Sequence, residues 1–98
     1  MSIYENKYLS LGEFLKKKRI EAKITQGELA KDLSISAQMV SNWENGRCGP
    51  PSDLLIDLAK FLFIKKEELL QNILMSSEQF YKKKLKINDH KRRKKNTA

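Results

Sequence analysis

The sequence is poor in the residues that build disulfide frameworks, metal sites and catalytic centres. It has one cysteine, Cys48, and one histidine, His90. A single cysteine cannot close an internal disulfide, and a cysteine without a histidine cluster does not form a metal site. The sequence also has no Ser/His/Asp set and no glycine-rich phosphate loop. We therefore expect no enzyme activity, no metal and no cofactor.

Long apolar stretches are missing as well. No run approaches the roughly 18 residues of a membrane span, and the N-terminus, MSIYENKYLSLGEF, lacks the apolar core of a secretory signal. A chain of 98 residues with 40% hydrophobic content suits one domain with a modest core and some tail. We expect a cytoplasmic protein with no membrane partner.

Positive charge is abundant but unevenly placed. The formal net charge is +8. Residues 76–98 hold nine Lys/Arg and two acidic residues, whereas residues 1–75 hold eleven basic and ten acidic residues. The total favours an anionic partner such as nucleic acid. Because residues 1–75 are nearly neutral, function there must depend on where particular side chains lie.

Apolar periodicity predicts an all-α fold with five helices and no strand. The first three are expected at about 11–22, 26–33 and 37–45. A fourth follows with Ser52 as its N-cap, and a fifth begins near Lys65.

Three regions are expected along the chain: an N-terminal arm (1–10), a helical domain (11–75) and a basic C-terminal extension (76–98). Beyond Met75, a segment with Phe80 and Tyr81 either prolongs the fifth helix or forms a sixth. From about Asn88 the chain is polar and basic, so we expect disorder there.

The stretch from Thr25 to Gly46 is the most informative part of the sequence. Thr25 and Glu28 fit a capping box at the start of one short helix, and Ser36 can cap the next. Ser34 lies in the turn between them. The pattern predicts two short helices joined by a tight turn.

The second of these helices is expected to present an uncharged polar face. Val40 and Trp43 lie three residues apart and turn one side of the helix inward. The opposite side then carries small or amide-bearing side chains, namely Ala37, Gln38, Ser41 and Asn42. Glutamine can pair with adenine through two hydrogen bonds, serine and asparagine can bond base edges, and an alanine methyl can meet a thymine methyl. Such a face is typical of a recognition helix in the DNA major groove.

The same region resembles the Cro/C1-type (lambda-repressor-like, XRE-like) helix-turn-helix family. The resemblance covers roughly residues 11–74 without a gap. It rests on Ile24-Thr25-Gln26, Glu28-Leu29-Ala30, Leu33, Ile35-Ser36, Val40-Ser41, Trp43-Glu44-Asn45-Gly46, Pro50 and Leu58-Ala59. It implies a five-helix DNA-binding domain, usually dimeric and usually acting as a transcriptional repressor.

The resemblance also implies roles for individual residues. Gln26 matches a phosphate-binding glutamine at the start of the second helix, where a helix N-terminus itself favours an anion. Asn45 and Arg47 match positions that often touch the DNA backbone. Arg19 and Glu44 match a buried or half-buried ion pair. The full set of expected phosphate contacts is Thr25, Gln26, Ser36, Asn45 and Arg47.

Four positions depart from the family pattern. Lys23, Ser34 and Phe63 replace glycines that are common at helix ends or in the turn. If these residues keep a positive φ, each costs about 1–2 kcal/mol; otherwise the local backbone differs. Lys65 replaces the usual Ser/Thr cap of the fifth helix.

The favoured function is a dimeric, sequence-specific transcriptional regulator, a repressor that binds double-stranded DNA at an inverted-repeat operator. The alternative is an antitoxin that regulates its own promoter and binds a toxin through residues 76–98; a co-regulator is another protein partner to consider. A third hypothesis is a non-specific nucleic-acid binder driven by the basic tail. An apolar set either completes the core or pairs two protomers: Ile73, Leu74, Phe80, Tyr81 and Leu85.

Overall fold

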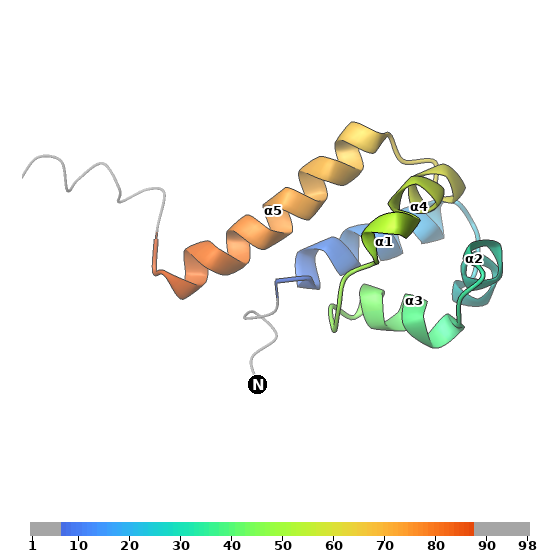
Figure 1. The fold of residues 1–98 in the computed structure, drawn as a ribbon, viewed down its shortest axis with the longest axis horizontal. Helices are drawn as coiled ribbons and strands as arrows, with labels where there is room; N and C mark the ends of the chain where they lie inside the picture. The colour runs from blue at the N-terminus through green and yellow to red at the C-terminus, as the bar shows by residue number, and fades with distance from the viewer. Residues whose placement is uncertain (1–6, 88–98) are drawn as a thin grey trace, which may run out of the picture.

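The computed structural model describes residues 7–87, and every regular element within that range is helical. The elements are α1 (Leu9–Glu21), α2 (Gln26–Leu33), α3 (Ala37–Glu44), the short 3-10 helix η2 (Ser52–Leu54), α4 (Leu55–Phe61) and α5 (Lys66–Lys84) (Figure 1). The expected all-α fold with five α-helices is confirmed for this part of the chain. The expected disorder from about Asn88 and most of the N-terminal arm lie outside the described residues.

Two expected boundaries are corrected by the structure. Helix α1 begins at Leu9, so Leu9 and Ser10 belong to the helix and not to the arm. Ser52 does not cap the fourth helix: it is the first residue of η2, and Leu54 is the N-cap residue of α4. The reason is a tighter turn at this point, in which the Leu54 N–H donates to the Pro51 carbonyl at 3.0 Å.

Helix α5 is the longest of the described helices. Lys65 precedes it without a capping side-chain bond, and the helix continues unbroken to Lys84. The segment with Phe80 and Tyr81 therefore prolongs α5 and does not form a separate helix. None of the helices within residues 7–87 combines the length and apolarity needed to cross a membrane.

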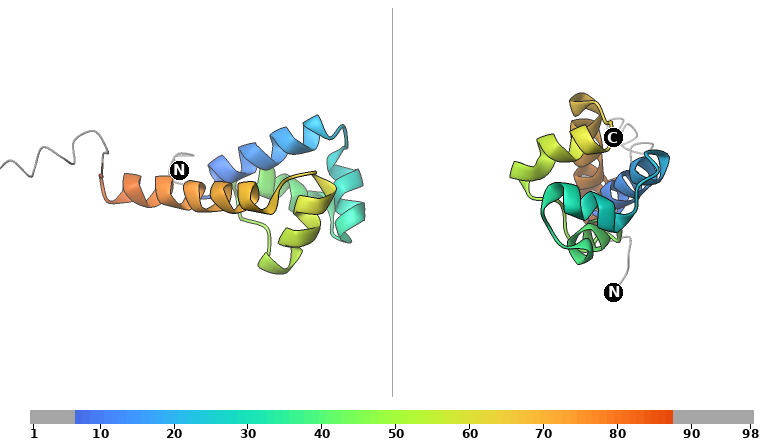
Figure 2. Two further views of the ribbon diagram at one scale, coloured as in Figure 1. Left: turned by 90° about the horizontal axis from the view of Figure 1, so that it is seen from above. Right: turned by 90° about the vertical axis from the view of Figure 1, so that its right-hand side faces the viewer.

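The core lies where α1 meets the other helices, packing against both α3 and α5 (Figure 2). Val40 and Trp43 of α3 are both fully buried, as their spacing predicted. The buried apolar set is Leu11, Leu15, Leu29, Ala30, Leu33, Val40, Trp43, Leu58, Ala59, Leu62, Ile64 and Leu69. Because these residues include members of all five α-helices, the orientation of α3 is fixed by the core as a whole.

Helices α1, α2 and α4 each end in the same kind of strained turn. Lys23, Ser34 and Phe63 have φ of 63°, 59° and 56°, so they keep the positive φ that glycine favours. The residue after each is an isoleucine whose N–H reaches back to a helix carbonyl, as in the 2.9 Å bond from Ile35 to Ala30. These isoleucines are buried or pack against the core. The returning bond and the apolar contact offset the strain of about 1–2 kcal/mol at each turn.

Ser76 fastens α5 to the beginning of α1. Its hydroxyl accepts a hydrogen bond from the Leu11 N–H at 3.1 Å and donates one to the Lys7 carbonyl at 2.6 Å. The first N–H groups of a helix have no partner within the helix, so Ser76 acts as a cap supplied by a distant segment. The expected division at residue 75 therefore falls inside a continuous helix and beside a buried contact.

We expect Ser76→Ala to lower the free energy of unfolding by about 1–3 kcal/mol, because it leaves the buried Leu11 N–H without a partner. Urea unfolding followed by circular dichroism measures this change. Ser77→Ala is the matched control, since Ser77 is only half-buried. Equal stability of the two variants would show that the Ser76 bonds are not needed.

Candidate nucleic-acid interface

The helix-turn-helix segment is held by two side-chain caps. Thr25 Oγ1 accepts from the Glu28 N–H at 3.0 Å, and Glu28 Oε1 accepts from the Thr25 N–H at 2.8 Å. Ser36 Oγ accepts from the Met39 N–H at 3.2 Å. Both caps were predicted from the sequence. They set where α2 and α3 begin and leave the two helices joined by the turn at Ser34.

Helix α3 turns its uncharged face to solvent. Ala37 and Gln38 are exposed, and Ser41 and Asn42 are half-buried. Val40 and Trp43 hold the other side of the helix in the core. Met39, for which the sequence predicted no role, is also partly exposed on this short helix.

The amide side chains of α3 are linked to one another. Gln38 Nε2 donates to Asn42 Oδ1 at 3.0 Å, and Arg47 donates to the same oxygen at 3.1 Å. Asn45 Nδ2 donates to the Ser41 carbonyl at 3.0 Å and to the Ser41 hydroxyl at 3.2 Å. This network was not predicted from the sequence, although a glutamine and an asparagine four residues apart on a helix are a known bonding pair.

Gln38 can keep its hydrogen bond to Asn42 and still bond a second partner. Only one of its two amide N–H groups is used by Asn42, and within residues 7–87 its Oε1 has no hydrogen-bond partner. A glutamine needs one acceptor and one donor to pair with an adenine edge. The Asn42 bond therefore orients Gln38 without consuming the groups that a base would use.

Arg19 and Glu44 form an ion pair behind this surface. The Arg19 Nε to Glu44 Oε2 distance is 2.6 Å, and the side chains are 11% and 3% exposed. A second guanidinium nitrogen donates to Glu44 Oε1 at 3.1 Å, so the pair is bidentate. A further nitrogen donates to the Ile24 carbonyl at 2.8 Å. Arg19 thus ties α1 to α3 and to Ile24 in the turn between α1 and α2.

Gln26 joins the same cluster, which the sequence alone did not show. Its Nε2 donates to Glu44 Oε1 at 2.9 Å. This bond positions the side chain at the first turn of α2 and leaves its second amide N–H for another acceptor. Within the described residues, the backbone N–H groups of Gln26 and Gly27 have no partner. Three donors therefore gather where α2 begins.

Other reactive groups do not converge near this surface. Cys48 is a free, exposed thiol in the loop after α3. Among residues 7–87, no three His, Cys, Asp or Glu side chains are grouped so that they could hold a metal ion.

Comparison with known proteins agrees with this geometry. The profile of the helix-turn-helix family matches residues 15–69, more than half of the chain. The chain belongs to the Cro/C1-type helix-turn-helix family. It is 43% identical over 58 residues to the HTH-type transcriptional regulator DicA of Escherichia coli (strain K12). That match covers 59% of this chain and 43% of the regulator, so the chain spans less than half of its relative. No solved structure matches the chain significantly.

Proposed function

We propose that this helix-turn-helix protein is a DNA-binding transcriptional regulator that represses its target by binding an inverted-repeat operator as a dimer. The observation that carries the proposal is the uncharged amide face of α3, oriented by the core on one side and by its own hydrogen bonds on the other. A face of this kind selects bases through hydrogen bonds and not through bulk charge. Binding over a promoter would block transcription without any chemistry.

Gln38 is the principal base reader in this proposal. The free Oε1 and the second amide N–H are arranged for a bidentate contact with adenine N6 and N7. Asn42 and Ser41 supply further polar contacts, and Ala37 supplies a methyl contact for thymine. Their half-buried or exposed positions on α3 support these roles.

Phosphate contacts are proposed at both ends of the motif. The Gln26 amide and the free backbone N–H groups at the start of α2 form one donor group, where the helix dipole also favours an anion. Asn45 and Arg47, just past α3, form the other. Thr25 and Ser36 use their hydroxyl lone pairs as caps, so in this proposal their hydroxyl hydrogens face the DNA backbone.

Gln38→Ala tests the base-reading role. We expect it to reduce discrimination against the wrong base at one operator position by about 10- to 100-fold, because a bidentate pair contributes about 1–3 kcal/mol. Selection of bound fragments from random DNA, followed by titration of matched and mismatched duplexes, measures this change. Gln79→Ala on α5 is the control, since that glutamine is exposed and lies outside the family match. An unchanged base preference in Gln38→Ala would remove Gln38 from the site, and enrichment of no motif by the unmodified protein would sink the proposal.

A second function, that of an antitoxin, is favoured by the exposed apolar side chains of α5. A toxin bound to this surface would mask it while α3 stays free for the promoter. Its test must not remove residues 76–98 wholesale, because that deletion also removes the buried Ser76 cap. Deletion after residue 87 and single changes on α5 are suitable instead. Co-purification of one defined protein, lost on these changes with promoter binding intact, would establish this function.

A further inference from the structure

A stripe of exposed apolar side chains runs along α5. Leu70, Leu74, Tyr81 and Leu85 are 53%, 58%, 49% and 68% exposed. Ser77 lies between Leu74 and Tyr81. Successive residues of this series are three or four positions apart, which keeps them on one face of a helix. We call this set the α5 stripe. Its second half lies beyond the other helices (Figure 1), and all of it lies outside the family match at residues 15–69.

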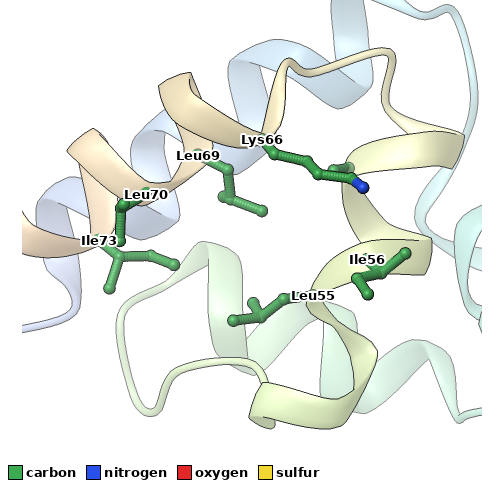
Figure 3. Close-up of a pocket in the computed structure, with 7 residues that line it drawn as sticks. Leu55, Ile56, Lys66, Leu69, Leu70 and Ile73 are labelled. Carbon is green, nitrogen blue, oxygen red and sulfur yellow. The ribbon is translucent and has the colours of Figure 1, made fainter.

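An apolar groove continues the α5 stripe onto α4. It has a volume of about 170 Å³ and lies between Leu55 and Ile56 of α4 and Leu69, Leu70 and Ile73 of α5. Lys66 lies at its edge, and Leu70 belongs to both the groove and the stripe (Figure 3). An apolar surface that extends over two helices is typical of a protein interface.

The end of α5 repeats the strained turn found at three other helix ends. Lys86 has a φ of 57°, and the Ile87 N–H donates to the Lys82 carbonyl at 2.8 Å. At the other three turns the isoleucine is buried or packs on the core. Ile87 is instead 44% exposed, next to the exposed Leu85. The turn therefore fixes the positions of Leu85 and Ile87 at the end of α5, where both side chains stay exposed within a single chain.

We propose that the α5 stripe pairs antiparallel with the α5 stripe of a second copy of this chain, with Leu85 and Ile87 of each copy seated in the groove of the other. This inference rests on the proposed dimeric function and names its surface. In a two-fold interface, residue i meets residue j and residue j meets residue i. A two-fold axis between Ser77 and Glu78 places Leu70 opposite Leu85 of the partner and Leu74 opposite Tyr81 of the partner. The small Ser77 side chains of the two copies then lie beside the axis, one residue apart along the helices.

The same register brings the end of the partner's α5 helix to the groove. Leu70 lines the groove, so a partner Leu85 opposite it lies at the groove entrance, and Ile87 follows two residues further along. The stripe from Leu70 to Leu85 is only about 22 Å long at 1.5 Å per residue. Stable interfaces bury roughly 1,200–2,000 Å², and filling the grooves extends the contact from one helix to two in each copy.

Charge complementarity favours the antiparallel direction. The first turn of α5 carries Glu67 and Glu68, and its last turn carries Lys82, Lys83 and Lys84. Antiparallel pairing brings Glu67 and Glu68 of one copy toward the lysine-rich last turn of the other and opposes the two helix dipoles. Parallel pairing would instead set the lysine-rich turns of the two copies against each other. An unrelated protein partner would require neither the self-matching spacing nor this end-to-end charge pattern.

Leu74→Glu tests the surface. We expect the unmodified chain to have the mass of a dimer in sedimentation or light scattering. The variant should raise the dimer dissociation constant by at least about 100-fold, because two carboxylates would face the partner's apolar stripe. Met75→Glu is the matched control: Met75 is 44% exposed on the same helix but points away from the stripe. Circular dichroism should show that both variants are folded, since both side chains are exposed in one chain.

Cysteine crosslinking tests the register in a Cys48→Ser background, which removes the native thiol. Because disulfides need Cα atoms within about 7 Å, Ser77→Cys should crosslink to itself under mild oxidation. Leu70→Cys should crosslink only when mixed with Leu85→Cys. Efficient self-crosslinking of Leu70→Cys, or failure of Ser77→Cys to crosslink, would overturn the antiparallel register.

The outcomes separate this inference from the proposed function. A Leu74→Glu variant that remains a dimer places the interface elsewhere and overturns the inference, while the dimeric repressor stands. A chain that is monomeric both free and on operator DNA overturns the inference and the dimeric part of the function together. Base reading by α3 is judged independently, by the Gln38→Ala experiment.

Discussion

Glu44→Ala should lower the free energy of unfolding by about 3–5 kcal/mol, because it leaves the Arg19 guanidinium without its anion in a nearly buried position. The loss includes both bonds of the bidentate pair and the Gln26 amide bond to the same carboxylate. Folded domains have a total stability of only about 5–15 kcal/mol. The variant should therefore unfold at much lower urea, which fluorescence of the buried Trp43 measures.

A double change distinguishes an unpaired charge from lost packing. Arg19→Met combined with Glu44→Met removes both charges and keeps apolar bulk, so it should recover most of the loss. Glu21→Ala is the surface control, because that glutamate is 53% exposed and its contact with Lys18 is 3.8 Å long. Contacts of this kind contribute at most about 1 kcal/mol. If Glu44→Ala and Glu21→Ala had equal free energies of unfolding, the ion pair between Arg19 and Glu44 would contribute no more to stability than a surface contact.

Gly12→Ala should destabilise the domain by roughly 3 kcal/mol, since an added methyl has no room between α1 and α3. A Cβ at Gly12 would lie 2.3 Å from the Trp43 carbonyl oxygen and 2.8 Å from the Glu44 carbonyl oxygen. Both neighbours are backbone atoms, so relief requires the two helices to separate. The expected readout is a lower urea midpoint and weaker DNA binding, because separation displaces the helix that carries Gln38.

Gly27→Ala provides the matched comparison for this prediction. A Cβ at Gly27 would meet only Thr25 Oγ1, at an ordinary 3.8 Å. Alanine in a helix is more favourable than glycine by about 0.5–1 kcal/mol. The two substitutions should therefore shift stability in opposite directions. A destabilisation of equal size at both positions would contradict the close approach of α1 to α3.

The sequence predicted the parts of the structure that depend on neighbouring residues. The Thr25 and Ser36 caps are formed within four residues, and the inward direction of Val40 and Trp43 follows from helical spacing alone. These local features fix the helix-turn-helix and hence the exposed side of α3. The boundaries at Leu9 and Ser52 were wrong because they depend on how the chain packs beyond its own turn.

Contacts between distant residues could not be predicted in the same way. Ser76 bonds to residues 65 and 69 positions away, and a lone serine in a helix pattern does not indicate such a partner. The Gln26 bond to Glu44 likewise requires the folded arrangement of α2 and α3. The resemblance indicated that Arg19 and Glu44 are paired. It did not show that the same carboxylate also orients Gln26.

Helix α1 connects the two surfaces proposed for function. It touches α3 at Gly12 and is fastened to α5 through Ser76. If two copies pair through α5, the separation and the angle between their two α3 helices are set by this connection and not by a flexible linker. Adjacent half-sites on B-DNA lie one turn, about 34–36 Å, apart, so one added base pair rotates a half-site by about 35°. Such a dimer would tolerate changes in base sequence between its half-sites far better than changes in the number of bases.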